Sequence, residues 1–319
     1  MVSVALCTYN GGRYLPPQLA SLAAQTLPPG EVVACDDAST DGTPALLERF
    51  AADAPFPVRV VRNPVNLGTT ANFDWAIGLC AGDAIALCDQ DDVWRPQKLA
   101  RFAAAFADPA VGLVASDLEL TDADGQVLGR RLWGELPFTQ ALQAGVEAGG
   151  GPRLWVRRNT VTGASAAFRA DLRDAILPIP AGWVHDAWVA LIAAALRPVR
   201  LIAEPLTLYR LHPAQQIGSP PRTLRRQVTA ARRRNAEDFA TVAANFAAAA
   251  DRLAQFRDRL PDPAVVALLR GKAAFAAAQQ AMREGSRAAR LAPALRELGA
   301  GHYATYGRGL GGFVADLLL

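Results

Sequence analysis

Three aspartates lie within four positions of one another, directly after an apolar run that has the pattern of a buried strand. Asp89, Asp91 and Asp92 follow the run Ala84–Cys88. Like charges packed so closely are costly unless a cation or hydrogen-bond donors compensate them. Carboxylate oxygens suit Mg²⁺ or Mn²⁺, which proteins hold with one or two carboxylates and substrate phosphates. We therefore predict a divalent-cation site here. The alternative is a solvated acidic turn that caps the next helix.

A second acidic turn contains the adjacent pair Asp36 and Asp37, followed by Ser39 and Asp41. One of these side chains can cap the helix expected from Thr43, because Asp and Ser satisfy the free N–H groups of a first turn. Two adjacent carboxylates exceed what capping requires. We predict that the remaining carboxylate accepts hydrogen bonds from a nucleobase imide or a ribose hydroxyl.

Strand-like and helix-like patterns alternate four times before these motifs end. The expected strands are 2–7, 31–35, 58–61 and 84–88, and the expected helices are 15–25, 43–52, 70–80 and 96–107. This alternation predicts an α/β fold with a parallel sheet covered by helices on both faces. Ligands of such sheets bind beyond the carboxyl ends of the strands. The acidic turns are therefore expected to meet at one rim.

Phosphate-binding loops of the common nucleotide folds are absent from the sequence. No G-x-G-x-x-G follows the first strand, and no G-x-x-x-x-G-K-S/T occurs anywhere. This argues against a dinucleotide-dependent oxidoreductase. Any bound diphosphate would need another source of positive charge, which a cation on the acidic cluster supplies.

Four sequence blocks together resemble the nucleotide-sugar half of family 2 glycosyltransferases, which have the GT-A fold. They are VSVALCTYNG from Val2, DDASTDGT from Asp36, the block from Asn63 to Phe73, and LCDQDDVW from Leu87. Three later blocks, Asn159–Phe168, Trp183–Trp188 and Leu208–Gln216, are similar to the acceptor half of bacterial polysaccharide enzymes of the rhamnosyltransferase type. The resemblance covers about residues 1–218. It implies a Rossmann-like, mostly parallel sheet.

The resemblance also implies roles for individual residues. Asp37 would read the base, Asp89 would lie near the ribose and sugar, and Asp91 would bind Mn²⁺ or Mg²⁺, with His212 either a further metal ligand or an ordinary loop histidine. Arg210 would meet the departing diphosphate, since a guanidinium suits phosphate geometry. The remaining donor-binding positions would be Thr8, Tyr9, Asn10 and Asn66.

Asp186 matches the general base of the family, and the alternative for it is a helix N-cap. Inverting transfer needs one carboxylate that takes the proton of the acceptor hydroxyl. His185 stands where many relatives carry an acidic residue. The expected acceptor-side residues are Thr162, Gly163, Trp183 and Trp188, the two tryptophans as sugar-stacking or core residues. The Gly-rich stretch 130–158 is expected to form a mobile loop over the acceptor site.

Composition and net charge exclude some classes of protein. The chain has 319 residues, 51% hydrophobic, with a net charge of +3, which argues against a dedicated nucleic-acid binder. Its four cysteines have no zinc-ligand spacing and are expected in the core. No apolar run is long enough to cross a bilayer and no secretory signal is recognisable, so we expect a cytosolic protein.

Charge and composition change near residue 220. Residues 1–219 carry 17 basic and 22 acidic side chains, whereas residues 220–319 carry 16 and 8. We predict a glycosyltransferase domain over 1–219, divided into a nucleotide-sugar half (1–117) and an acceptor half (118–219). A helical region over 220–319 follows, with helices around 236–257 and 262–284. Its arginines (Arg222, Arg225, Arg226 and Arg232–Arg234) and apolar end suggest either a solvated helical face or contact with anionic lipid at the inner face of the membrane.

Together these features predict an inverting, metal-dependent glycosyltransferase. Its donor would be dTDP-rhamnose or a UDP-hexose, and its acceptor a glycan or lipid-linked saccharide of a bacterial surface polysaccharide. The alternative is a catalytically silent nucleotide- or sugar-binding module on the same fold.

Overall fold

The computed structural model describes residues 1–212 and 235–318 of the chain. Within them the chain forms two compact units, one of residues 1–151 and 160–212 and the other of residues 152–159 and 235–318. The predicted boundary between residues 219 and 220, and the arginines predicted on a helix between 222 and 234, lie outside the described residues.

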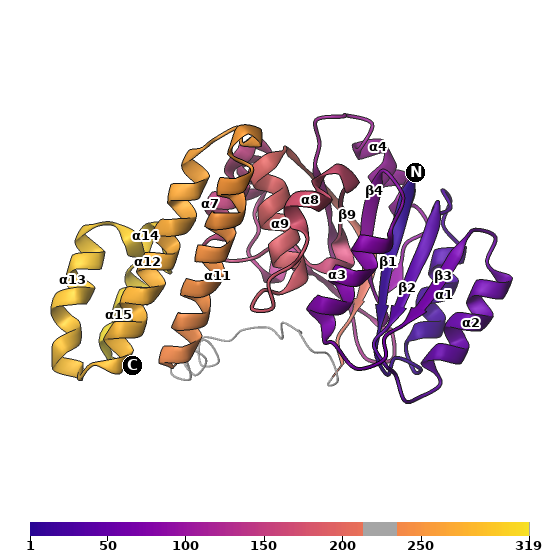
Figure 1. The fold of residues 1–319 in the computed structure, drawn as a ribbon, viewed down its shortest axis with the longest axis horizontal. Coiled ribbons are helices and arrows are strands. Elements are labelled where there is room, and N and C mark those ends of the chain that lie inside the picture. Colours follow the sequence, from indigo (N-terminus) through magenta and orange to yellow (C-terminus); the bar gives the residue numbers. More distant parts are fainter. Residues whose placement is uncertain (213–234, 319) are drawn as a thin grey trace. The chain divides into compact units, whose positions relative to one another are not determined.

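The first half of the sheet in the larger unit is parallel, as the alternating pattern predicted. It comprises β1 (Val2–Thr8), β2 (Glu31–Asp36), β3 (Val58–Arg62) and β4 (Ala84–Asp89), in the order β3-β2-β1-β4 (Figure 1). The register pairs Thr8 with Asp36, and Cys7 with both Cys35 and Asp89. The three strands that carry the polar turns therefore end at the same level of the sheet.

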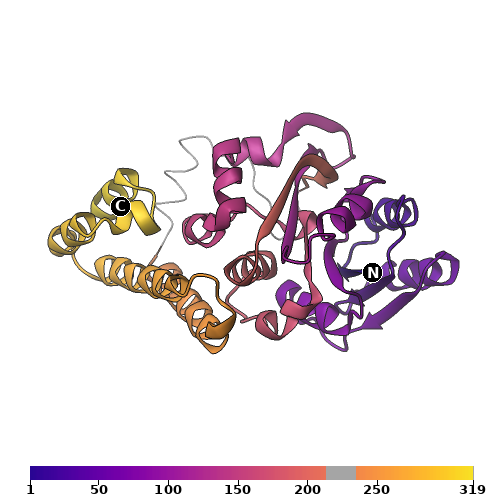
Figure 2. The same ribbon diagram turned by 90° about the horizontal axis from the view of Figure 1, so that it is seen from above.

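Helices cover both faces of this half. The first four helices are α1 (Leu15–Ala23), α2 (Thr43–Asp53), α3 (Thr69–Leu79) and α4 (Lys98–Ala105). Leucines of α1 and α2 and Phe102 of α4 join alternate strand residues such as Val4 and Leu6 in one core cluster. Helix α3 contacts β1, β2 and α9 (His185–Leu196), which places it on the opposite face, and Figure 2 shows both layers. All eight predicted elements are confirmed within one or two residues at most ends.

The second half of the sheet is mostly antiparallel. Its strands are β5 (Val93–Trp94), β6 (Leu113–Thr121), β7 (Val127–Arg131), β8 (Ala166–Arg169) and β9 (Val199–Arg210), and the order continues β4-β8-β6-β9-β5, with β7 on β6. Strand β8 runs antiparallel to β4 and β6, while β6 and β9 are parallel. The sheet is therefore mixed beyond β4. This extension carries residues 162–165 and the end of β9 to the rim where β1 and β4 end.

The stretch 130–158, predicted as a mobile loop, instead forms short helices. After β7 come α5 (Leu132–Glu135), α6 (Gln140–Gly145), a π-turn over Val146–Gly150 and α7 (Gly151–Trp155), followed after β8 by α8 (Arg173–Ile176). Trp133 and Trp155 are both buried. The prediction was wrong because the bulky apolar residues between the glycines bury themselves and so order the segment.

The second unit is helical. Helices α11 (Ala236–Gln255) and α12 (Ala264–Glu284) pack together, and α13 (Leu291–Gly299), α14 (His302–Tyr306) and α15 (Leu310–Leu318) follow. Phe275 of α12 packs edge-on against Tyr303, whose hydroxyl donates to Asp316 at 2.9 Å. The two long helices confirm the predicted ones. No helix among the described residues is long and apolar enough to cross a bilayer.

Candidate functional site

A cavity of about 380 Å³ opens in the larger unit where β1, β2 and β4 end. Its lining combines the polar turns after these strands with residues of α3, α9 and the segments beside β8 and β9. Ten of the lining residues were predicted as site residues: Thr8, Tyr9, Asn10, Asp37, Asp89, Asp91, Thr162, Gly163, Asp186 and His212. The topology thus gathers side chains that are up to two hundred positions apart in the sequence.

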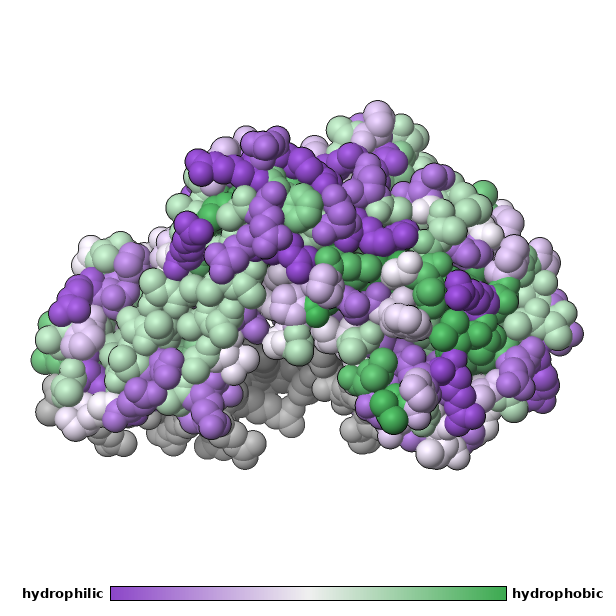
Figure 3. Space-filling view, viewed as in Figure 1, coloured by the Kyte–Doolittle hydropathy of each residue, from purple (hydrophilic) through white to green (hydrophobic). Residues whose placement is uncertain are grey.

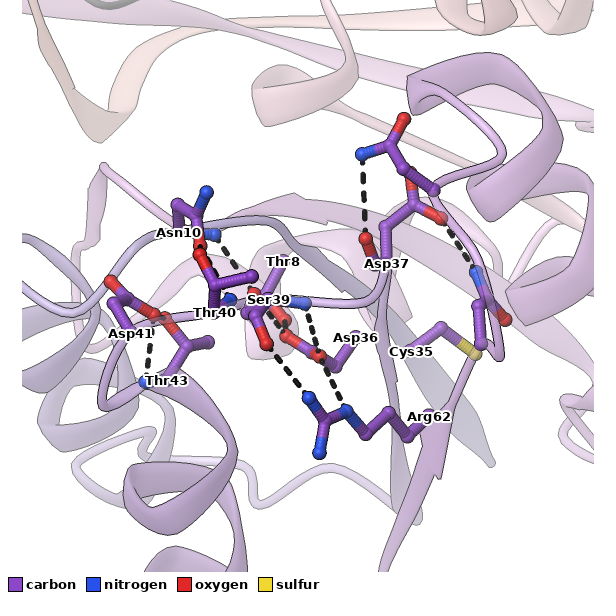
Figure 4. Close-up of polar contacts among 12 residues, drawn as sticks. Thr8, Asn10, Cys35, Asp36, Asp37, Ser39, Thr40, Asp41, Thr43 and Arg62 are labelled. Carbon is purple, nitrogen blue, oxygen red and sulfur yellow. Dashed lines mark hydrogen bonds and ion pairs between the residues drawn. The ribbon is translucent and has the colours of Figure 1, made fainter.

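The two adjacent aspartates after β2 face different surroundings (Figure 4). Asp36 is fully buried and accepts hydrogen bonds from the Thr8 hydroxyl at 3.0 Å and from the amide of Ser39, also at 3.0 Å. Asp37 lines the cavity and accepts from the Asn63 amide group and from the backbone N–H of Gly68, at 2.8 and 2.9 Å. Asp36 therefore holds the turn together, and Asp37 is the carboxylate presented to a ligand. A third aspartate, Asp41, accepts a hydrogen bond from the backbone N–H of Thr43, the first residue of helix α2.

The turn after β1 is fixed to the turn after β4 by one glutamine. The Gln90 side chain accepts from the backbone N–H of Tyr9 at 2.8 Å and donates to the Tyr9 carbonyl at 3.0 Å. Asn10, in the left-handed region at φ 48°, accepts from the backbone N–H of Thr40. Asn tolerates this conformation better than most residues. These bonds hold Tyr9 beside the acidic cluster.

The acidic cluster after β4 has three aspartates with three distinct environments. Burial, followed by the charges of Asp91 and Asp186, raises the pKa of Asp89 to about 8. Among the described residues, no hydrogen-bond donor reaches the Asp89 carboxylate, which faces the cavity. Asp92 is 1% exposed, and burial together with the neighbouring carboxylates raises its pKa well above the usual value. Asp92 accepts a hydrogen bond from the backbone N–H of Arg210 inside the turn, and Asp89 is left to meet a ligand.

Asp91 and His212 form the part of the cluster that fits a cation. The Oδ2 atom of Asp91 and the Nε2 atom of His212 are 2.9 Å apart, and the imidazole packs on Tyr14 with ring centroids 4.4 Å apart. Two ligands at right angles around an ion with bonds of about 2.1 Å are separated by about 3 Å, so this spacing suits neighbouring positions of one octahedral ion. In the described part of the chain, no group of three or more His, Cys, Asp or Glu side chains is arranged to hold a metal ion. A cation here would complete its shell with phosphate and water oxygens.

Asp186 begins the first turn of α9 and points into the same cavity. Burial raises its pKa to about 6, against the opposing effect of the hydrogen bonds from the backbone N–H groups of Gly163 and Ala187. The Gly163 N–H lies 3.1 Å from Oδ2. A carboxylate with this pKa is mostly ionised at neutral pH yet basic enough to accept a proton, which is what a general base needs.

Four predicted site residues do not line the cavity. Asn66 is exposed and donates only a long bond, 3.4 Å, to the Asp37 carbonyl. Trp188 is fully buried and donates its indole N–H to the Ile176 carbonyl, with Trp183 packed beside it. The Arg210 guanidinium donates to the backbone carbonyls of Asp91 and Ala123 at 2.9 and 3.0 Å. Arg210 therefore shapes the acidic turn from behind.

Three residues to which the sequence assigned no role, Phe73, His185 and Lys98, belong to the site or support it. Phe73 and His185 line the cavity as a stacked pair. Lys98 is fully buried beneath the acidic turn, with its ammonium 3.7 Å from the centre of the Trp94 ring. A signal for Lys98 was present, because it shares the apolar face of α4 with Leu99 and Phe102. A lysine on such a face needs partners.

Comparison of sequences connects this site to known enzymes. Residues 3–152 match the family model of Glycosyl transferase family 2. An uncharacterized glycosyltransferase of Nostoc sp. is 27% identical over 216 residues, which are 67% of this chain and 65% of that protein. Abequosyltransferase RfbV of Salmonella typhimurium is 30% identical over 39% of this chain and 38% of its own. The matches cover less than two thirds of these relatives' own lengths.

Solved structures share the fold. The crystal structure of S. aureus TarS 1-349 covers 99% of this chain and 90% of its own, with a TM-score of 0.57 and 15% identity. The mannosyltransferase PcManGT from Pyrobaculum calidifontis, in complex with GDP-Man and Mn²⁺, covers 99% and 85%, with a TM-score of 0.55 and 21% identity. At these identities the likeness extends to the architecture alone.

Proposed function

We propose, from the premise that this chain belongs to glycosyltransferase family 2, that it transfers a sugar from a nucleotide-sugar donor to a saccharide acceptor with inversion at the anomeric carbon. One observation carries the proposal: Asp37, Asp89, Asp91 and Asp186, from four separate segments, line a single cavity. A silent binding module would have no use for a carboxylate whose raised pKa suits proton transfer.

The nucleoside would lie against the turns after β1 and β2. The Oδ1 atom of Asp37 accepts hydrogen bonds from Asn63 and Leu67, whereas Oδ2 accepts one from Gly68 and so has a second lone pair for a base or ribose donor. Thr8, Tyr9 and Asn10 line the same part of the cavity. Asp89, without a donor among the described residues, would accept from hydroxyl groups of the ribose or the transferred sugar.

Mn²⁺ or Mg²⁺ would be held by Asp91 and His212 together with the donor diphosphate. When bound, such an ion neutralises negative charge on the diphosphate and so makes it a better leaving group. The chain's own part is to hold the two ligands in place. The Arg210 guanidinium holds Asp91 in place by donating to the backbone carbonyl of Asp91, and the Tyr14 ring holds the His212 ring by packing on it.

Asp186 would act as the general base. The acceptor oxygen forms a bond to the anomeric carbon while the bond from that carbon to the phosphate oxygen breaks, and the hydroxyl proton passes to Asp186. The Gly163 N–H at 3.1 Å keeps Oδ2 oriented. Retention would need a second carboxylate as a nucleophile, whereas a single base suffices for inversion.

A donor panel with and without Mn²⁺ tests this function. It should contain dTDP-rhamnose and UDP-glucose, together with UDP-N-acetylglucosamine and GDP-mannose, and should score nucleoside diphosphate release and saccharide product. We expect Asp91→Ala to abolish release, and Asp186→Ala to abolish transfer while nucleotide binding survives. Asp53→Ala, at the exposed end of α2, is the matched control. Near wild-type transfer by Asp186→Ala would overturn the assignment of the base.

The donor sugar proposed from the sequence blocks is rhamnose carried on dTDP, with a UDP-hexose second. One relative is an abequosyltransferase, and one structure of TarS is a complex with UDP-GlcNAc. The polysaccharide role rests on the same kind of support, since a succinoglycan biosynthesis protein, ExoO of Rhizobium meliloti, is 35% identical over 40% of this chain.

We further propose that the second unit touches an anionic membrane surface from the cytosolic side, where a lipid-linked acceptor would lie. Leu291 and Leu295 of α13, and Leu310 and Val314 of α15, are about half exposed or more. Each pair is spaced i, i+4 and therefore shares one helix face. The surplus of basic residues in 220–319 supplies the complementary charge. Figure 3 shows a broad pale green area, which marks moderately hydrophobic residues, over the alanine-rich α11 and α12.

A further inference from the structure

His185 is a buried imidazole in the wall of the cavity, directly before Asp186. It is 4% exposed, and its ring lies flat on Phe73, with centroids 3.8 Å apart and planes inclined by 13°. Both rings line the cavity. The stack fixes the plane of the imidazole, so that its two nitrogens keep set directions.

Neither ring nitrogen of His185 has a hydrogen-bond partner among the described residues. A buried polar atom left in this state destabilises the folded protein and is uncommon in native structures. Burial lowers the pKa of His185 to about 3, so the ring is neutral at physiological pH. A neutral imidazole has one N–H donor and one acceptor nitrogen.

The Nε2 atom of His185 lies close to Gly163. A Cβ built on Gly163 would lie 2.7 Å from this nitrogen and 3.4 Å from the Oδ2 atom of Asp89, so a side chain at this position would crowd the imidazole. On its other side, the Gly163 N–H binds the proposed base, Asp186. Glycine at residue 163 therefore allows an imidazole and two carboxylates to come together beside one backbone position in the cavity wall.

We propose that His185 binds a hydroxyl group of a sugar in this cavity and so helps to select the saccharide. The inference rests on the proposed function and adds a residue that reads the substrate. A sugar hydroxyl both donates and accepts hydrogen bonds. A neutral imidazole beside Asp89 can donate to the hydroxyl oxygen, and an unprotonated carboxyl oxygen of Asp89 can accept the hydroxyl proton.

The hydroxyl can belong to the transferred sugar or to the acceptor sugar, since Asp89 and Asp186 line the same cavity. Nuclear magnetic resonance of the imidazole groups separates these sources. The chain has three histidines, so His185→Gln, His212→Gln and His302→Gln assign each ring signal. Mg²⁺ should be used in place of paramagnetic Mn²⁺. The probes are UDP against UDP-glucose, dTDP against dTDP-rhamnose, and each diphosphate with free rhamnose or glucose.

We expect the His185 signals to move with an intact nucleotide sugar, or with a diphosphate plus monosaccharide, and not with the diphosphate alone. The first result assigns the hydroxyl to the donor and the second to the acceptor. Unmoved His185 signals in a protein that binds the nucleotide sugar would overturn the inference and leave the proposed function standing. If no nucleotide shifts any signal of the protein, the proposed function and this inference fall together.

Variants give an independent readout. His185→Phe keeps a ring on Phe73 but removes both nitrogens, and we expect transfer to fall about tenfold, with a relaxed preference among sugars. His185→Gln, which retains a polar group near Nε2, should recover most of the loss. Gly163→Ala should displace the His185 ring and weaken nucleotide-sugar binding more than diphosphate binding. His302→Phe, in the second unit, is the matched control. Equal activity and sugar preference in His185→Phe and wild type would overturn the inference.

Discussion

The ammonium of Lys98 donates a 2.6 Å hydrogen bond to the carbonyl of Ala164, which links helix α4 to the turn that presents Gly163 to the base. The same carbonyl also accepts from the Thr207 hydroxyl, and Lys98 donates to that hydroxyl at 3.0 Å. Burial lowers the pKa of Lys98 to about 7, against the opposing effects of Cys88, Asp92 and Asp89. The buried lysine thus supports the orientation of Asp186 indirectly. It binds the Ala164 carbonyl, and the neighbouring Gly163 donates its N–H to Asp186.

Lys98→Met should therefore impair transfer more than it impairs folding. The methionine side chain keeps the apolar packing of the lysine stem, and Thr207 still donates to the Ala164 carbonyl. We expect a fall in kcat of about tenfold or more with a melting temperature within a few degrees of wild type. Steady-state kinetics and thermal melting check this, with Lys272→Met of the second unit as the control. A variant that melts early and keeps its kcat would show that Lys98 serves folding alone.

The transfer rate should fall on the acid side of pH 6. Asp186 must be ionised to accept a proton, and burial raises its pKa to about 6. Below this value kcat/KM should drop about tenfold for each pH unit. A pH–rate profile of the wild type measures this acid-side fall in kcat/KM. A fall centred near pH 4, the ordinary pKa of an aspartate, would contradict the assignment of Asp186 as the base.

The stability of the protein without added metal should decline as pH rises from 4 to 8. The folded-state pKa of Asp186 lies above its unfolded value of 3.8, so this group's contribution to stability is complete below pH 3.8 and is lost as pH rises through about 6. Asp186→Asn removes that titration. The variant should therefore melt about 5 °C above wild type at pH 7.5 and close to it at pH 4.5. A difference that is constant with pH would contradict the raised pKa.

Binding of Mn²⁺ should depend on Asp91 and, more weakly, on His212. Electron paramagnetic resonance of free Mn²⁺ in the presence of UDP or dTDP measures the affinity. We expect Asp91→Asn to abolish binding and His212→Gln to weaken it about tenfold or more, since loss of one ligand leaves the other in place. Chelation by EDTA should stop transfer, and added Mn²⁺ should restore it. Wild-type affinity in His212→Gln would show that His212 only packs on Tyr14.

The apolar faces of α13 and α15 should carry membrane binding. Flotation with vesicles containing about 30% anionic phospholipid should bring the wild type to the top fraction, and added salt should weaken this. Replacing both Leu310 and Val314 with Ser should abolish flotation while leaving donor turnover unchanged. Exposed Ala-to-Ser changes on α11 provide a control. No flotation of the wild type at moderate salt would remove the membrane proposal.

The alternation of apolar runs and turns was enough to predict the parallel half of the sheet. Each run from Val2 to Cys88 is short, mostly apolar and bounded by turn residues, and in the first, second and fourth strands this pattern agrees with burial in the sheet. The same logic placed Asp37, Asp89 and Asp91 at one rim, because parallel strands end together. The resemblance of whole sequence blocks added Asp186 and His212, which periodicity alone does not find.

Only the tertiary structure decided which polar residues face the cavity. Asp36 and Asp37 are adjacent and chemically equal, yet successive strand-end residues point to opposite sides, so one builds the turn and the other meets the ligand. Arg210 was expected to meet a diphosphate, and instead it binds backbone carbonyls behind the acidic turn. Lys98 finds its hydrogen-bond partners in Ala164 and Thr207, which are far away in the chain. His185 stacks on the distant Phe73, and its ring nitrogens have no hydrogen-bond partner among the described residues. Such contacts depend on how β8 pairs with β4 and how α9 packs against β8, and no local pattern encodes that packing.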